Sequence, residues 1–172
     1  MKSLLTTIFT ILAILFSCSV QAQNSQSHGH PDHLEILVEE YLNVKNSLTS
    51  DELESAQKHL RAFSDEVKNS SEMNHHEEHS EQHEMHHGSM TEAVQQAEQA
   101  DDIDSFRLAF REISEQLLKA LENQGYEGDL FKQYCPMYED GSAWISDSEE
   151  IANPFYGDQM HNCGETVEEL RN

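Results

Sequence analysis

Two short clusters near the C-terminus carry side chains that bind soft metal ions. Thiolate and thioether sulfurs are the donors that Cu(I) prefers, and an imidazole also binds Cu(II) or Zn(II). If the two clusters meet in the fold, part of this set is enough to hold one Cu(I) ion. We therefore predict a main metal site formed by Cys135, Met137, Met160, His161 and Cys163.

The same two cysteines have a second interpretation, as a disulfide. In a compartment that oxidises thiols, two remaining cysteines most often pair. A Cys135–Cys163 disulfide would stabilise the fold by roughly 3 to 4 kcal/mol on the chain-entropy model. The methionines and the histidine beside the cysteines favour the metal site, because a disulfide does not require them. A pair that is a disulfide when empty and a dithiol when it holds Cu(I) would combine both interpretations, and we state this as a hypothesis.

A second group of metal-binding side chains lies in a His/Met/Glu-rich insert at residues 70–90. If the insert becomes helical, histidines four residues apart share one face and form pairs that bind Zn(II) or Cu(II) weakly. The alternative is a solvated tether without a core of its own. The histidines of this secondary site are His75, His76, His79, His83, His86 and His87.

The N-terminal segment predicts export. Residues 1–22 carry one lysine, an apolar run from Leu4 to Phe16 and then small and polar residues up to Ala22, which is the pattern of a signal peptide. We expect cleavage after Ala22 and a periplasmic location. The alternative is a lipoprotein, in which Cys18 becomes the lipidated N-terminus and binds the membrane. Under both interpretations Cys18 is not a free thiol of the mature domain.

The helices that must position the main site follow from apolar spacing. Residues 23–31 are polar and are expected to be disordered, and residues 32–172 form one domain. Within it, apolar residues recur at intervals of three and four, which indicates amphipathic helices. These positions are Leu34, Leu37, Val38, Tyr41 and Leu48; Leu53, Ala56, Leu60, Phe63 and Val67; Ala93, Val94, Ala97 and Ala100; and Phe106, Ala109, Phe110, Ile113, Leu117 and Leu121.

We therefore predict an all-α fold, a three- to four-helix up-and-down bundle. It carries a C-terminal cap segment rich in aromatic residues, Cys and Met, from Leu130 to Gly164. Trp144 is expected to be the apolar plug of this segment, with a cation–π contact to a bound ion as the alternative. No run alternates well enough to predict a strand, and Glu165 to Arg171 is expected to form a last helical turn.

Charge and motifs limit the function. The net charge of -23 disfavours nucleic acid as a partner and is compatible with binding cations. The sequence has no nucleophile elbow, phosphate-binding glycine loop, HExxH or CxxCH motif. We therefore expect a binding protein and no enzyme.

A resemblance supports this interpretation. The string DIDSFRLAFREISEQL, followed by the elements CPM, WIS, IANPFYG and MHNCG, is similar to the bacterial domain of unknown function 3347 family. The similarity covers about residues 32–164 apart from the insert. Members of that family occur alone in exported proteins or fused to periplasmic adaptor subunits of heavy-metal efflux pumps. The resemblance thus implies a helical fold, an envelope location and an association with copper or related metal handling, but no established reaction. We therefore expect a copper-binding chaperone, buffer or efflux accessory. The alternative is a disulfide-stapled module that binds an efflux adaptor or another envelope partner.

Overall fold

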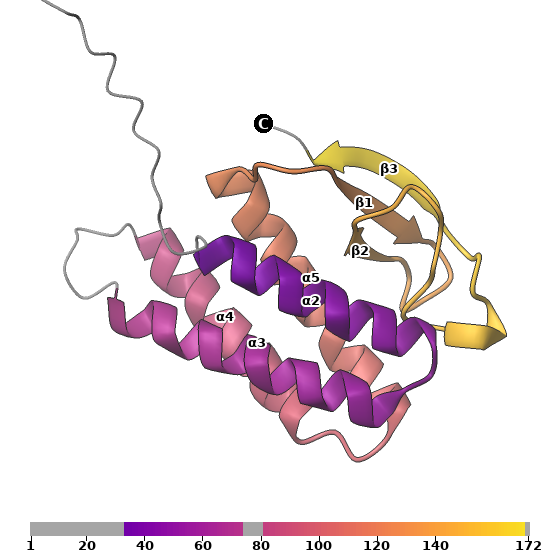
Figure 1. Cartoon of the computed structure of the whole chain (residues 1–172), viewed down its shortest axis with the longest axis horizontal. Coiled ribbons are helices and arrows are strands. Elements are labelled where there is room, and N and C mark those ends of the chain that lie inside the picture. Colours follow the sequence, from indigo (N-terminus) through magenta and orange to yellow (C-terminus); the bar gives the residue numbers. More distant parts are fainter. Residues whose placement is uncertain (1–32, 74–80, 171–172) are drawn as a thin grey trace, which may run out of the picture. The chain divides into compact units, whose positions relative to one another are not determined.

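The computed structural model describes residues 33–73 and 81–170, which belong to one compact unit (Figure 1). The proposed signal peptide, Cys18 and the stretch 23–31 lie outside the described residues, as do His75, His76 and His79. None of the helices in the described ranges is long and apolar enough to cross a membrane. The elements are α2 (His33–Thr49), α3 (Leu53–Met73), α4 (Glu81–Glu98), α5 (Ile103–Gln124), β1 (Leu130–Cys135), β2 (Ser142–Ser146), the 3-10 helix η2 (Gly157–Gln159) and β3 (Glu165–Leu170).

The predicted helices are confirmed. In α5, specific residues cap both ends of the helix. The Asp102 side chain accepts a hydrogen bond of 2.8 Å from the backbone N–H of Ser105, which satisfies one of the free donors of the first turn. At the other end, the N–H of Gly125 donates to the carbonyl of Leu121. Both ends of α5 are therefore capped, and its apolar stripe faces the core.

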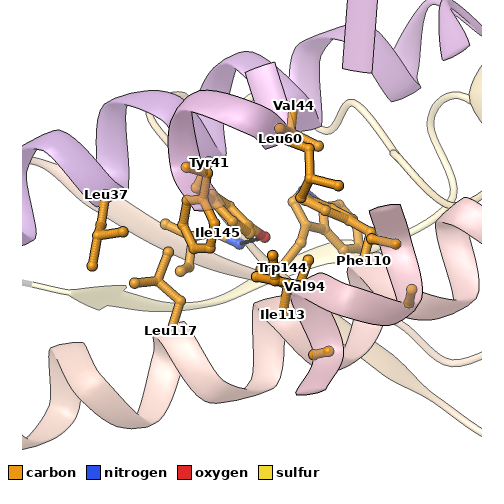
Figure 2. Packing of buried hydrophobic residues seen from close by; sticks show 14 of the residues in the cluster. Leu37, Tyr41, Val44, Leu60, Val94, Phe110, Ile113, Leu117, Trp144 and Ile145 are labelled. Carbon is orange, nitrogen blue, oxygen red and sulfur yellow. Dashed lines mark hydrogen bonds between the residues drawn. The ribbon is translucent and has the colours of Figure 1, made fainter. Parts of the chain in front are cut away.

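The core joins helices to the C-terminal segment. Tyr41 of α2 stacks on Phe110 of α5 with ring centroids 5.0 Å apart, and its hydroxyl lies 2.7 Å from the Ser114 hydroxyl. The backbone N–H of Ile145 in β2 donates to the same Tyr41 oxygen at 3.1 Å. Figure 2 shows Tyr41, Phe110, Trp144 and Ile145 within this cluster. One buried hydroxyl therefore connects two helices and a strand.

The prediction of an all-α fold is wrong, because the C-terminal segment forms a three-stranded antiparallel sheet of order β2-β1-β3. Within the described residues the fold is mixed, with four α-helices and one small sheet. The last helical turn expected from Glu165 to Arg171 is wrong too, since Glu165–Leu170 is strand β3. Burial alternates in β1 from Phe131 to Cys135, but the sequence LFKQYC does not alternate in polarity, and β3 is exposed along most of its length. Pairing with β1 makes β3 a strand, and the sequence pattern carries no signal of it.

The described ends of the His/Met/Glu-rich insert, residues 70–73 and 81–90, belong to helices α3 and α4. Helix α3 continues to Met73 and α4 begins at Glu81, so positions 83, 86 and 87 lie on a helix. Met90 is only 7% exposed and belongs to the hydrophobic core, in contrast to the expectation that this stretch adds nothing to the core.

Candidate functional site

The two cysteines far apart in sequence meet at the end of the sheet. Cys135 is the last residue of β1, and Cys163 precedes β3, whose residue Glu165 pairs with Tyr134. The two Sγ atoms are 2.8 Å apart, and both thiols are free. Cys135 is fully buried and Cys163 is partly exposed. We call Cys135 and Cys163 the thiol pair.

The separation of the sulfurs defines what the thiol pair can do. A disulfide requires about 2.05 Å between the sulfurs. A tetrahedral ion with sulfur ligands at about 2.3 Å holds two of them roughly 3.8 Å apart. The observed 2.8 Å lies between these values, so a small inward movement closes a disulfide and an outward movement of about 1 Å admits an ion. The geometry is therefore compatible with both interpretations of the cysteines.

Asn153 holds the turn that carries Cys163. Its side-chain Nδ2 donates to the Cys163 carbonyl at 2.6 Å, and its backbone N–H donates to the His161 carbonyl at 2.8 Å. Its Oδ1 accepts the N–H groups of Phe155 and Tyr156. Asn153 is not among the site residues predicted from the sequence. A fully buried asparagine with these partners also fixes the position of the Cys163 backbone.

The other predicted ligands lie on the chain segments next to the two cysteines. Met137 is 62% exposed, and its carbonyl accepts the Tyr156 hydroxyl at 2.9 Å. Met160 is half-buried, and its carbonyl accepts the Cys163 N–H at 3.0 Å, so Met160, His161 and Cys163 share one turn. His161 is exposed. The two clusters of the sequence thus lie on neighbouring loops.

Trp144 packs against the backbone that follows Cys163. It is fully buried, with its ring edge-on to Phe155 at 5.8 Å between centroids. A Cβ at Gly164 would lie 2.7 Å from the indole ring, so only glycine allows the backbone after Cys163 to lie this close. Trp144 occupies the core position expected of an apolar plug.

The proton on Cys163 is held firmly. A hydrogen bond with Cys135 and, after it, burial raise the pKa of the Cys163 thiol to about 11. At neutral pH this thiol is therefore protonated, and a metal ion has to displace the proton to bind the sulfur.

Among the described residues, no histidine or carboxylate side chain joins the thiol pair to form a three-residue metal site. Among the residues whose side chains the structure describes, 33–69 and 88–170, no three drawn from His, Cys, Asp and Glu come together within reach of one metal ion. His161 therefore does not complete a three-residue group with the thiol pair in this arrangement. A third ligand would have to be a thioether, or His161 after its turn moves.

Comparison with known protein families identifies the family of this chain. A family model described as a protein of unknown function, DUF3347, matches residues 37–128, which is more than half of the chain. The chain belongs to the DUF3347 family. The match covers most of α2 and all of α3, α4 and α5, and it ends before β1, so it stops short of the expected limit at residue 164. The thiol pair lies outside the residues that the family model matches. Neither a curated protein nor a solved structure matches the chain.

Proposed function

We propose that this DUF3347 protein is an exported metal-holding protein that binds Cu(I) through the thiol pair, as a chaperone, buffer or efflux accessory. The observation that carries the proposal is the 2.8 Å contact between the Cys135 and Cys163 sulfurs, with Met137 and Met160 on the adjoining loops. Two soft sulfurs already in contact need little rearrangement to bind one soft ion.

The ligand types favour Cu(I) over Zn(II). Structural zinc sites use four nitrogen, sulfur or oxygen ligands in a closed tetrahedron. Among the described residues no third His, Cys, Asp or Glu joins the thiol pair within reach of one ion, and the methionines on the adjoining loops offer thioethers, which suit Cu(I). Copper uptake would release the Cys163 proton, so we expect binding to strengthen as pH rises from 6 to 8, a range below the pKa of about 11.

A competitive Cu(I) titration of the reduced mature domain tests the proposal. We expect one ion per chain, with an affinity that falls by at least about 100-fold in Cys163→Ser, because a hydroxyl is a poor ligand for Cu(I). Ser142→Ala is a matched control, since Ser142 pairs with Cys135 across the sheet but its hydroxyl bonds to the Tyr138 carbonyl. Equal affinity in wild type and Cys163→Ser would exclude the thiol pair as the site.

A second candidate function is a disulfide-stapled module that binds an efflux adaptor or another envelope partner. The sulfur separation supports it, since closing a disulfide requires a smaller movement than opening the pair for an ion. Counting free thiols in protein purified from the periplasm separates the two. Complete pairing, together with no Cu(I) uptake after reduction, would favour this second function.

The histidine-rich insert is proposed as a weak secondary site for Zn(II) or Cu(II). Helix α4 includes positions 83 and 87, which are one turn apart, as such a pair requires. Replacing the histidines at 75, 76, 79, 83, 86 and 87 by alanine is expected to lower Zn(II) and Cu(II) stoichiometry and leave Cu(I) affinity unchanged. Substitution is preferable to deletion, because Met90 in the same stretch packs in the core. Unchanged stoichiometry would remove the insert from the proposal.

A further inference from the structure

A buried arginine of the helical part is bonded to the loop that leads to Cys163. Arg107 of α5 is only 2% exposed. Its Nε donates to the Pro154 carbonyl at 2.9 Å, and its Nη2 donates to the Leu48 carbonyl at 2.9 Å. The same Nη2 also donates to Oδ1 of Asp51, which lies in the turn between α2 and α3. One guanidinium therefore joins α5, the α2–α3 turn and the loop.

Asp51 completes the connection from the other side. Its second carboxylate oxygen, Oδ2, accepts the backbone N–H of Asp158 at 3.1 Å. Gly157 lies directly on the ion pair: its φ is +52°, and a Cβ there would collide with both the Asp51 carboxylate and the Arg107 guanidinium. The Arg107–Asp51 pair thus bonds to the loop at residue 154 and again at residue 158, and the loop backbone fits only without a side chain between them.

The loop connects the Arg107–Asp51 pair to Cys163 through two adjacent residues. Asn153 is adjacent to Pro154, the acceptor of Arg107, and its Nδ2 donates to the Cys163 carbonyl. The Asn153 carbonyl accepts the N–H of Gly157, which closes the loop on itself. Cys135, in contrast, is held by the strand β1. Cys163 is held on its C-terminal side by the pairing of Glu165 with Tyr134 and on its N-terminal side by the loop, and the loop is bonded to Arg107 and Asp51.

Stability alone does not require this ion pair. Buried ion pairs are often replaceable by apolar side chains without loss of stability, because burying two charges costs about as much as their attraction returns. Arg107 donates two hydrogen bonds to backbone carbonyls, one of which lies in the loop. Because the guanidinium is planar, the directions of these two hydrogen bonds are fixed relative to each other. That is the arrangement expected of a residue that positions a loop.

We propose that Arg107 and Asp51 are positioning residues for the thiol pair: by holding residues 153–158 they set how closely Cys163 is held to Cys135. This inference rests on the thiol pair of the proposed function and adds how the helices control it. Arg107 and Asp51 both lie within the region matched by the DUF3347 model, whereas the two cysteines lie outside it. Residues in the matched helical part of this chain thus position a pair of cysteines that lies at the end of the sheet.

The glutathione equilibrium of the thiol pair measures this control without any metal. In that reaction the protein dithiol gives two electrons and two protons to oxidised glutathione, and the products are the protein disulfide and two molecules of reduced glutathione. Its equilibrium constant reports the effective concentration of one thiol toward the other. Failure of the proposed copper function therefore leaves this test intact.

The experiment compares two variants and a control in the mature chain. In Arg107→Met, which keeps the volume but not the hydrogen bonds, we expect the constant to fall about tenfold because the loop is no longer held. In Asp51→Asn, whose side chain is 38% exposed and which should fold even if Arg107→Met does not, we expect a fall of about threefold. Tyr41→Phe removes a buried hydrogen bond whose partner, Ile145, is not part of the loop, and is expected to lower the melting temperature with the constant unchanged. A constant equal to wild type in a folded Arg107→Met or Asp51→Asn protein, or an equal fall in Tyr41→Phe, would overturn the positioning role.

Discussion

Cys163 combines partial exposure with a strongly held proton. Its pKa is raised to about 11 by the hydrogen bond with Cys135 and by burial. Only the thiolate reacts with alkylating agents, so the reduced protein should react with iodoacetamide far more slowly at pH 8 than a free cysteine of pKa about 8.5. We predict that the rate rises steeply from pH 9 to pH 11. A rate at pH 8 equal to that of a model thiol would show that the pair does not protect the proton.

The same raised pKa has a consequence for stability. A group that binds its proton more tightly in the folded state stabilises that state while both states are protonated. The contribution in the reduced protein is therefore complete below the unfolded pKa of about 8.5 and is lost as pH rises through about 11. The disulfide form has no such proton, so its stability should not show this loss.

Asp51 behaves in the opposite sense. Its hydrogen bond with Arg107 holds its pKa below the usual value, with the N–H of Asp158 contributing in the same direction. The stabilisation is thus present above the unfolded pKa of about 3.9 and is lost as pH falls through the lower folded pKa. Because the side chain is partly exposed, we expect Asp51→Asn to cost only about 1 to 2 kcal/mol at pH 7. Urea unfolding at pH 7 and pH 3 measures this, and a cost that stays constant across that range would contradict the ion-pair explanation.

At the scale of elements, the junction between helices and sheet depends on Tyr41. Strand β2 lies at an edge of the sheet, and its Ile145 N–H is satisfied by the Tyr41 hydroxyl. Phenylalanine keeps the stacking on Phe110 but leaves this buried N–H unpaired, which costs about 1 to 3 kcal/mol. We predict that loss for Tyr41→Phe in chemical unfolding. A loss below a few tenths of a kcal/mol would mean that the edge strand does not need the hydroxyl.

The helices and the strands differ in how far sequence determines them. The α5 stripe, with Phe106, Phe110 and Leu117 at helical spacing and Asp102 at its start, carries its own signal, and the helix follows. Strand β3 has three glutamates and almost no buried side chain, so its extended form follows from pairing with β1. Contacts between segments distant in sequence decide such a strand, and local pattern does not show them.

The candidate site shows the same division. Only two cysteines are expected in the mature chain, so their meeting is a natural prediction from the sequence. The contributions of Asn153 and Arg107 are not, because each acts through backbone carbonyls whose positions only the fold defines. One signal was present: Arg107 lies beside Phe106 on the apolar face of α5, and a charge in that position indicates a buried partner.

At the scale of the whole molecule, the helices that the DUF3347 model matches pack against a small sheet that lies outside the matched residues. The two are joined by the Tyr41 hydroxyl in the core and by the Arg107–Asp51 pair at the loop. The acidic chain, with a net charge of -23, attracts cations in general, and selection for a soft ion must come from the sulfurs.

X-ray absorption at the copper edge of the reduced protein loaded with one Cu(I) per chain tests the central claim most directly. It identifies the atoms bound to the ion without assuming which residues supply them. The thiol pair predicts a first shell of two or three sulfur neighbours, and a Cys163→Ser sample should lose one of them. A first shell of nitrogen and oxygen alone would place the copper elsewhere and contradict the account.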